Sequence, residues 1–234
     1  MGIVDYYVSE QDFGIAHALN KLILASRGIL LKIITDDDAF DYSTINACKN
    51  FMLEHPDIDV INSEGGILNS QNVFKSLHYV NDYKEFQKSH KPFSFCELGV
   101  IFRRISIPVI GFRDITITRT DMEMSLRITS GNAHLAWCNL YSYVNILNAQ
   151  STSLVSVKKI KIETDRLNKF YLGKDPDNFF VEKFKIIRNK IRMLLSGRNG
   201  KIKTPNIEWS VLLSSAEKWL ETKNAEIKPE FIYN

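Results

Sequence analysis

A short apolar run at residues 29–34 does most to limit the folds open to this chain. The segment before it repeats apolar residues from Ile15 to Ile23 at helical spacing, and Gly28 is expected to end that helix. Three consecutive aspartates bound the run on its other side. So short a run between a helix end and an acidic turn predicts a buried parallel strand. A helix that leads into a buried strand is half of a βαβ unit, so the pattern favours an α/β fold.

Further helices and strands are expected along the chain. A helix should begin near Ser43, place Cys48 and Phe51 on one face, and end before Pro56. Strands are expected at residues 57–61 and 98–102, a helix at residues 121–128, and further helices beginning near residues 175 and 204. Residues 62–95 show no clear pattern. Long charged helical segments dominate after about residue 155, so a helical C-terminal region should follow the α/β layer.

Composition excludes several classes of protein. The chain has 234 residues, 44% apolar and 24% charged, which is ordinary for one or two globular domains. A net charge of +3 is too small to argue for nucleic-acid binding. No apolar run approaches the roughly 18 residues of a membrane span, and residues 1–12 lack the features of a signal peptide. We therefore expect a cytoplasmic protein whose Cys48, Cys96 and Cys138 are free thiols, since their spacing fits neither a zinc site nor disulfides.

The aspartates Asp36, Asp37 and Asp38 are the sharpest local signal for chemistry. In open α/β sheets, ligands bind at the carboxyl ends of strands, so acids placed there face a crevice. Adjacent carboxylates repel one another unless a cation neutralises them, and oxygen ligands suit Mg²⁺ or Mn²⁺. The alternative is a solvated acidic turn that leads into the next helix, and the three residues alone favour that alternative.

A second acidic pair, Asp121 and Glu123, lies at the start of the helix expected at residues 121–128. Backbone donors at a helix N-terminus would orient Asp121, which could then act as a general base. The alternative is that Asp121 caps the helix and Glu123 forms an i, i+4 ion pair with Arg127. The spacing does not separate the two interpretations.

Taken together, these motifs resemble the middle of a family 2 glycosyltransferase of the GT-A fold. In that family a segment of the type SExDxGIxxAxNKxxxxAxG runs into a strand and an acidic D-x-D or DD motif. The matching residues here are Ser9, Glu10, Asp12, Gly14, Ile15, Ala18, Asn20, Lys21 and Gly28, followed by residues 35–40, with Ser26 in place of the last alanine. Residues 102–104 and 110–112 resemble the family's FRR and iGgF segments, and Asp121-x-Glu123 resembles its acceptor-side acid motif. Glu163 is a weaker match to a later glutamate.

The resemblance implies a fold, a reaction and a set of roles. The fold would be a partial GT-A domain, a Rossmann-like mixed sheet, with a C-terminal helical extension. Asp36 and Asp38 would hold Mn²⁺ or Mg²⁺ against the diphosphate of a nucleotide sugar, with a UDP-sugar favoured. Asp12, Asp37 and Arg104 would contribute to donor binding. Asp121 would take the proton from the hydroxyl of a saccharide or lipid-linked acceptor in an inverting transfer, as in surface polysaccharide synthesis.

One departure from the family concerns the start of the chain. Family members open with a strand ending in a P-x-Y-N type motif and further βα units, and these have no match here. We expect a GT-A-like domain at residues 1–165 and a helical extension at residues 166–234. The missing units would come from another chain or a homo-oligomer, or the chain is an N-terminally truncated gene product, or the protein is a catalytically incomplete remnant that binds a partner. A basic amphipathic helix expected at residues 175–195 suits either packing on the domain or peripheral membrane contact.

Overall fold

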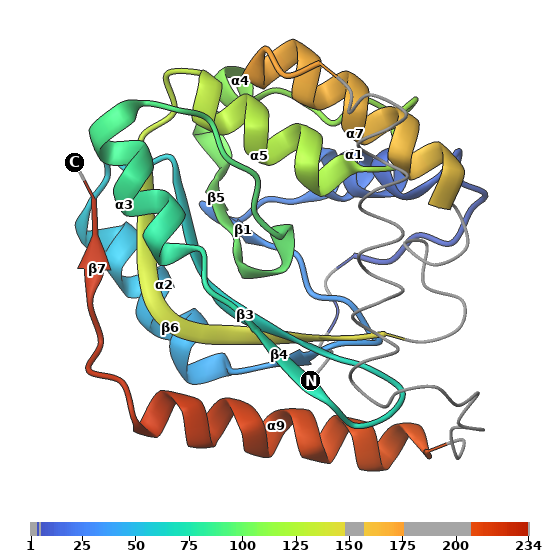
Figure 1. Ribbon diagram of the computed structural model, residues 1–234, viewed down its shortest axis with the longest axis vertical. Coiled ribbons are helices and arrows are strands. Elements are labelled where there is room, and N and C mark those ends of the chain that lie inside the picture. Colours follow the sequence, from blue (N-terminus) through green and yellow to red (C-terminus); the bar gives the residue numbers. More distant parts are fainter. Residues whose placement is uncertain (1–3, 5, 148–156, 176–206, 234) are drawn as a thin grey trace.

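The computed structural model describes residue 4 and residues 6–147, 157–175 and 207–233. These residues form a mixed α/β fold around one curled sheet (Figure 1). Its strands are β1 (Leu30–Lys32), β2 (Ala39–Phe40), β3 (Val60–Leu68), β4 (Phe74–Leu77), β5 (Ile101–Arg103), β6 (Leu135–Ile146) and β7 (Phe231–Ile232). The α-helices are α1 (Ile15–Ala25), α2 (Tyr42–Glu54), α3 (Val80–Ser89), α4 (Ile107–Ile110), α5 (Thr120–Ser130), α7 (Val157–Leu172) and α9 (Trp209–Ala225). Two short 3₁₀ helices are η1 (Glu97–Gly99) and η2 (Arg104–Ser106).

The sheet is mixed, with strand order β1-β5-β3-β6-β2, while β4 pairs with β3 and β7 with β6. The long strands β3 and β6 run parallel, and the other pairings in the described part of the chain are antiparallel. The β3–β6 register shifts on both sides of Glu64, which marks a bulge in the middle of the sheet. Within the described residues β1 pairs with β5 alone, so β1 forms one edge of the sheet.

The prediction of a buried parallel strand at residues 29–34 is wrong in both length and pairing direction. β1 covers three residues and pairs antiparallel with β5. Leu31 is buried, whereas Ile29 and Ile34 are 67% and 46% exposed. The preceding helix also ends earlier than expected, at Ala25 rather than near Gly28. The apolar residues of this segment indicate an extended backbone, but they do not show which strand lies beside it, because β5 comes from far along the chain.

The helix expected near Ser43 is confirmed as α2. The Asp41 side chain accepts a hydrogen bond from Thr44 N at 2.6 Å and caps the helix. Cys48, Phe51 and Met52 are buried on its inner face, and the helix ends at Glu54, ahead of Pro56. The helix expected at residues 121–128 is also confirmed, as α5, although its N-cap is Arg119.

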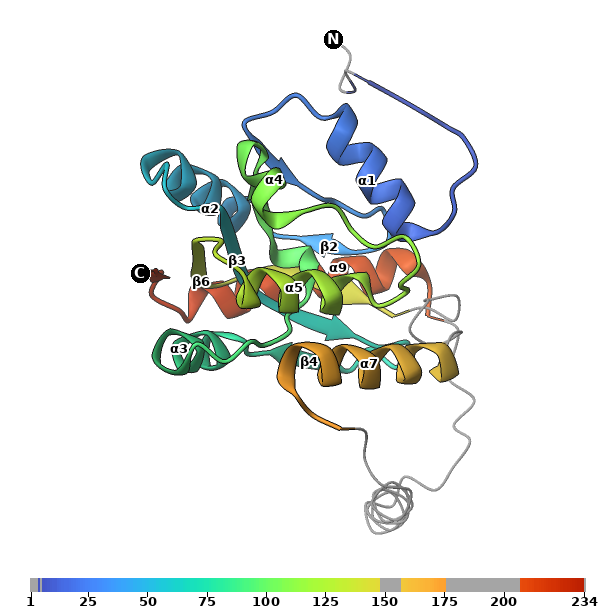
Figure 2. The same cartoon turned by 90° about the horizontal axis from the view of Figure 1, so that it is seen from above.

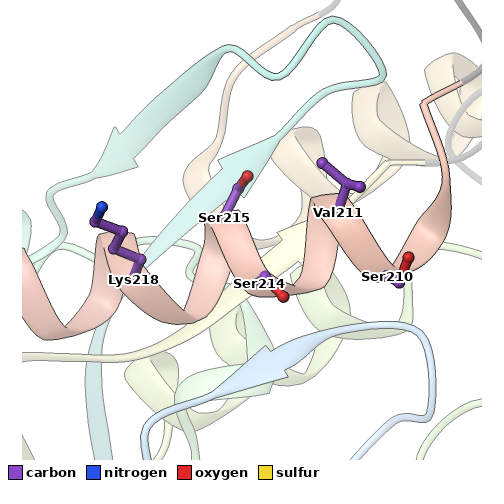
Figure 3. A pocket seen from close by; sticks show the side chains of 5 residues that line it. All are labelled: Ser210, Val211, Ser214, Ser215 and Lys218. Carbon is purple, nitrogen blue, oxygen red and sulfur yellow. The ribbon is translucent and has the colours of Figure 1, made fainter.

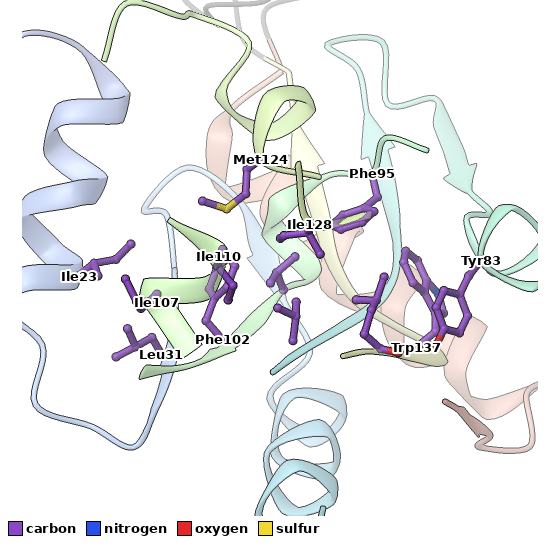
Figure 4. Packing of buried hydrophobic residues seen from close by; sticks show 13 residues of the cluster. Ile23, Leu31, Tyr83, Phe95, Phe102, Ile107, Ile110, Met124, Ile128 and Trp137 are labelled. Atoms are coloured by element: carbon purple, nitrogen blue, oxygen red, sulfur yellow. Dashed lines mark hydrogen bonds between the residues drawn. The ribbon is translucent and has the colours of Figure 1, made fainter. Parts of the chain in front are cut away.

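Three hydrophobic clusters fill the two sides of the sheet. The largest lies between the sheet and α1, α3, α4 and α5, with Phe102 and Trp137 near its centre (Figure 4). A second lies under α2. A third lies under α9, where Leu212, Ala216 and Leu220 are buried, so the helix expected from near residue 204 packs against the sheet.

The C-terminal helices lie against the rest of the fold. Figure 2 shows α7 beside α5, and α9 contacts β6 and β2. The predicted domain boundary at residue 165 falls inside α7. The basic helix expected from residue 175 lies outside the described residues. No helix in the described ranges is long and apolar enough to cross a membrane.

Candidate functional site

A cavity of about 560 Å³ lies at the carboxyl end of β1, between α1, α5 and α7. Its wall includes the loop after β1, the start of η1, the residues that lead into α5, and the end of β6. Four carboxylate side chains line it, and they belong to Asp37, Asp38, Glu97 and Asp121. Arg119 is the cation among the described residues of the lining. The cavity therefore joins the two acidic motifs of the sequence in one strongly acidic site.

Asp38 is the most deeply placed of the three consecutive aspartates. Its carboxylate accepts hydrogen bonds from Thr35 Oγ1 at 2.5 Å, Ile146 N at 2.9 Å and Asn145 Nδ2 at 3.1 Å. Burial raises the pKa of Asp38 above its ordinary value, more than these hydrogen bonds lower it. Asp38 therefore ties the acidic loop to the end of β6 and presents a carboxylate to the cavity.

The other two aspartates of the motif differ in where they lie. Asp37 is exposed and lines the cavity, whereas Asp36 is exposed and does not line it. Asp36 and Asp38 are the residues predicted to hold a metal ion. The geometry instead brings Asp37 and Asp38 to the same cavity.

Asp121, the predicted base, lies in the first turn of α5 with 43% of its side chain exposed. Its Oδ1 accepts a hydrogen bond from Met122 N at 2.8 Å and lies 3.8 Å from Arg119 Nε. The N-terminus of a helix carries partial positive charge, which attracts a carboxylate or another anion placed there. The site thus holds an accessible, oriented carboxylate across the cavity from Asp37 and Asp38.

Glu123 faces away from this site. Its carboxylate forms a two-point ion pair with Arg127, with Nε–Oε1 at 2.8 Å and Nη2–Oε2 at 3.1 Å. Arg127 also donates to Ile110 O. The alternative interpretation of an i, i+4 ion pair is therefore confirmed for Glu123.

Glu97 was not among the residues singled out in the sequence. Its carboxylate forms an ion pair with Arg113, whose side chain is fully buried behind the cavity wall. Asn20 fixes the backbone at Arg113 from both sides, since its Oδ1 accepts from Arg113 N and its Nδ2 donates to Arg113 O, each at 2.9 Å. The asparagine of the SExDxG segment therefore ties α1 to the loop behind the cavity.

Asp12 and Arg104, the other predicted donor-binding residues, do not line the cavity. Asp12 forms an ion pair with Lys21, which also contacts Glu10 at 2.8 Å, so these charges hold the segment before α1 against that helix. Arg104 donates from Nε to Gly28 O at 2.9 Å. Their predicted roles in donor binding stay predictions.

One thiol lines the cavity, and two buried phenols interact with that thiol. Cys96 lines it, and burial raises the pKa of its thiol to about 11, with the charge of Asp121 as the next cause. Burial also raises the pKa of Tyr143, which neighbours Cys96, and that of Tyr79 well above the ordinary values. These three groups are therefore uncharged at neutral pH.

The carboxylates were tested as possible metal ligands. Among the described residues, no group of three or more His, Cys, Asp or Glu side chains is arranged to hold a metal ion by itself. Mg²⁺ and Mn²⁺ are commonly held by one or two carboxylates while substrate phosphates and water supply the remaining ligands. Asp37 and Asp38 fit that type of site and do not fit an all-protein metal cage.

A second depression, of about 380 Å³, lies on the outer side of α9 (Figure 3). The described residues that line it are Ser210, Val211, Ser214, Ser215 and Lys218. Among the described residues it offers hydroxyls and one ammonium and no carboxylate or thiol.

Comparison with models of known protein families gave no match, and comparison with curated protein sequences gave none either.

Proposed function

We propose that this chain is a metal-dependent glycosyltransferase of the family 2, GT-A type, which moves a sugar from a nucleotide-diphosphate sugar to a hydroxyl acceptor with inversion. One observation carries the proposal. Two acidic motifs that are far apart in the sequence, and that resemble the metal-binding and base motifs of that family, line the same cavity. If the acidic turn and the capped helix had no common function, nothing would require their carboxylates to line one cavity.

Each residue of the cavity has its own role in the proposed reaction. Asp37 and Asp38 would hold Mn²⁺ or Mg²⁺, which when bound neutralises charge on the diphosphate of the donor. Asp121 accepts the proton of the acceptor hydroxyl, since it is accessible and held by the helix start. Arg119, beside Asp121, offers a positive charge to a phosphate or to the leaving group.

The first test is stabilisation by ligands, measured as thermal unfolding with Mn²⁺, UDP, or both. A ligand at about 100 times its Kd stabilises by about 2.7 kcal/mol, which is roughly 5–10 °C for a chain of this size. Asp37→Asn should abolish the shift given by Mn²⁺ with UDP. Asp36→Asn is the matched control, because Asp36 is equally exposed but lies outside the cavity lining.

The second test is turnover, measured as UDP release from a panel of UDP-sugars. Asp121→Asn should lose release by at least about 100-fold, the usual contribution of a general base, and keep the Mn²⁺–UDP stabilisation. Absence of both the metal-dependent shift and UDP release in the unmodified protein would refute the proposal.

A second candidate function is binding of a protein partner without catalysis. The open edge of β1 favours it, because no strand covers that edge among the described residues and Leu24 and Ile29 nearby are 71% and 67% exposed. UDP release that depends on Asp121 would exclude this candidate. The lipid-linked acceptor and the membrane contact stay predictions, since they rest on residues outside the described ranges.

A further inference from the structure

The short loop that enters α5 carries much of the cavity wall. Thr118, Arg119, Thr120 and Asp121 follow one another and all line the cavity. The first N–H groups of a helix have no partner within the helix. Arg119, at the N-cap position, gives no side-chain cap. The loop therefore needs an acceptor from elsewhere to hold its shape.

Glu163 of α7 supplies that acceptor. Its Oε1 and Oε2 accept hydrogen bonds from Thr118 N at 3.1 and 3.0 Å, and its Oε2 accepts from Arg119 N at 3.0 Å. The Glu163 side chain is 12% exposed, and Lys159 Nζ lies 3.7 Å from its Oε1. Charge-assisted hydrogen bonds from a carboxylate to backbone N–H groups are among the stronger ones in proteins.

The rest of α7 is fixed against α5, so the carboxylate is held in place. Leu167 is buried against Met122 and Leu126, and Tyr171 Oη donates to Glu123 Oε1 at 3.4 Å. Ile160, about one turn before Glu163, itself lines the cavity. Figure 2 shows the two helices side by side.

We propose that Glu163 is a positioning residue, whose carboxylate on α7 sets the loop that holds Arg119 and Asp121 at the cavity. The importance of this position for sugar transfer rests on the proposed function, but the dependence of the loop on Glu163 does not. Glu163 is not part of the cavity lining, and its hydrogen bonds run to the backbone of the loop, so it acts through the loop.

Two measurements follow the loop in the full chain without any need for turnover. Amide hydrogen exchange at Thr118 and Arg119 reports whether the carboxylate holds the backbone. Alkylation of Cys96 by iodoacetamide, followed by peptide mass spectrometry at pH 8, reports the position of Asp121. Burial is the first cause of the raised pKa of that thiol, and the charge of Asp121, which lines the same cavity, is the second.

Glu163→Ala should speed exchange at both amides at least about tenfold and speed Cys96 alkylation about threefold. Glu163→Gln keeps one oxygen acceptor and should give intermediate values, which also covers the case in which the alanine variant does not fold. Asp121→Asn should speed alkylation and leave exchange unchanged. Lys159→Ala, which removes the charge partner but no backbone cap, should match the unmodified protein in both.

Unchanged exchange and alkylation in the Glu163 variants would overturn the proposal. Faster exchange with unchanged alkylation would overturn it too, because the loop would then be capped without any effect on Asp121. Where UDP release is observed, Glu163→Ala should lower kcat about tenfold with KM for the donor nearly unchanged. Absence of release in the unmodified protein would count against the glycosyltransferase proposal and leave the exchange and alkylation results to decide the role of Glu163.

Discussion

Glu64 should make the stability of this protein fall between pH 5 and pH 8. The residue lies at the bulge in β3 and is 2% exposed. Its Oε1 accepts from Trp137 Nε1 at 2.7 Å, its Oε2 accepts from Tyr79 N at 3.0 Å, and His78 Nδ1 is 3.8 Å from Oε2. Burial raises the pKa of Glu64 from 4.5 to about 7, against the lowering effect of the Trp137 hydrogen bond.

The sign and size of the effect follow from proton linkage. The folded state binds the proton of Glu64 more tightly than the unfolded state does, so this contribution is fully present below pH 4.5 and is lost as the pH rises through about 7. Each pKa unit corresponds to about 1.4 kcal/mol, which gives a loss of about 3 kcal/mol in the free energy of unfolding. The contribution of Glu64 is isolated by difference between the unmodified protein and a variant.

Glu64→Gln isolates it, because the amide has nearly the same shape and cannot titrate. The variant loses the bond from Tyr79 N at every pH, a constant of about 1 kcal/mol. Urea unfolding followed by tryptophan fluorescence at pH 5, 6, 7 and 8 should show the unmodified protein losing about 3 kcal/mol relative to the variant. Glu85→Gln, an exposed acid on α3, should show no such difference. A constant difference between the unmodified protein and Glu64→Gln at all four pH values would refute the reasoning.

Two further substitutions test packing around the site. Gly111→Ala should lower the free energy of unfolding in urea by about 2–3 kcal/mol, because Gly111 has φ 82° and an added Cβ would lie 2.3 Å from Arg127 Nη1. Gly173→Ala is the control. Gly173 has φ 62° but open space around it, so this substitution should cost only about 1 kcal/mol. Asp38→Ala should lower the free energy of unfolding by about 3 kcal/mol, because it leaves Ile146 N and the other donors without their acceptor. Any loss of metal binding in that variant would therefore be combined with a loss of stability, which is not expected for Asp37→Asn.

Local signals predicted the elements whose ends are set by nearby residues. α2 follows from the Asp41 cap, the apolar face and Pro56, all within a short stretch of chain. β3 escaped prediction over most of its length because its buried residues Asn62, Ser63 and Glu64 are polar. They are tolerated through contacts with distant residues, such as Ser63 Oγ to Ser142 Oγ at 2.5 Å, which hydropathy does not reveal.

The central strand β6 was missed for the opposite reason. Both of its faces are buried, so its sequence is a nearly continuous run of apolar and aromatic residues without the alternation of a half-exposed strand. That run, rich in tyrosine and other strand-favouring residues, is the signal that would have indicated it. The parallel pairing expected for residues 29–34 belongs instead to β3 and β6.

The residues of the candidate site also differ in whether local sequence signals indicate them. The motif residues Asp37, Asp38 and Asp121 could be chosen from the sequence because they match the acidic motifs of the family that the chain resembles, although their positions at a strand end and a helix start left other interpretations open. Glu97 and Asn145 could not be chosen in this way, because their positions depend on contacts with distant residues. Glu97 forms an ion pair with Arg113, and Asn145 lies on β6 and donates a hydrogen bond to Asp38. Asp36 was preferred over Asp37 from the motif alone, and the turn of the backbone decides which of them lines the cavity.

The charge of the cavity links the fold to the order in which ligands should bind. Four carboxylates and one arginine among its described residues leave a net negative site, although the N-terminus of α5 adds partial positive charge. A diphosphate entering such a site is repelled until a divalent ion reduces the charge of Asp37 and Asp38. UDP alone should therefore leave thermal unfolding nearly unchanged, whereas UDP with Mn²⁺ should stabilise the chain by more than Mn²⁺ alone. Equal stabilisation by UDP with and without the metal would mean that Arg119 and the helix N-terminus hold the phosphates, and that the aspartates serve the fold rather than a metal.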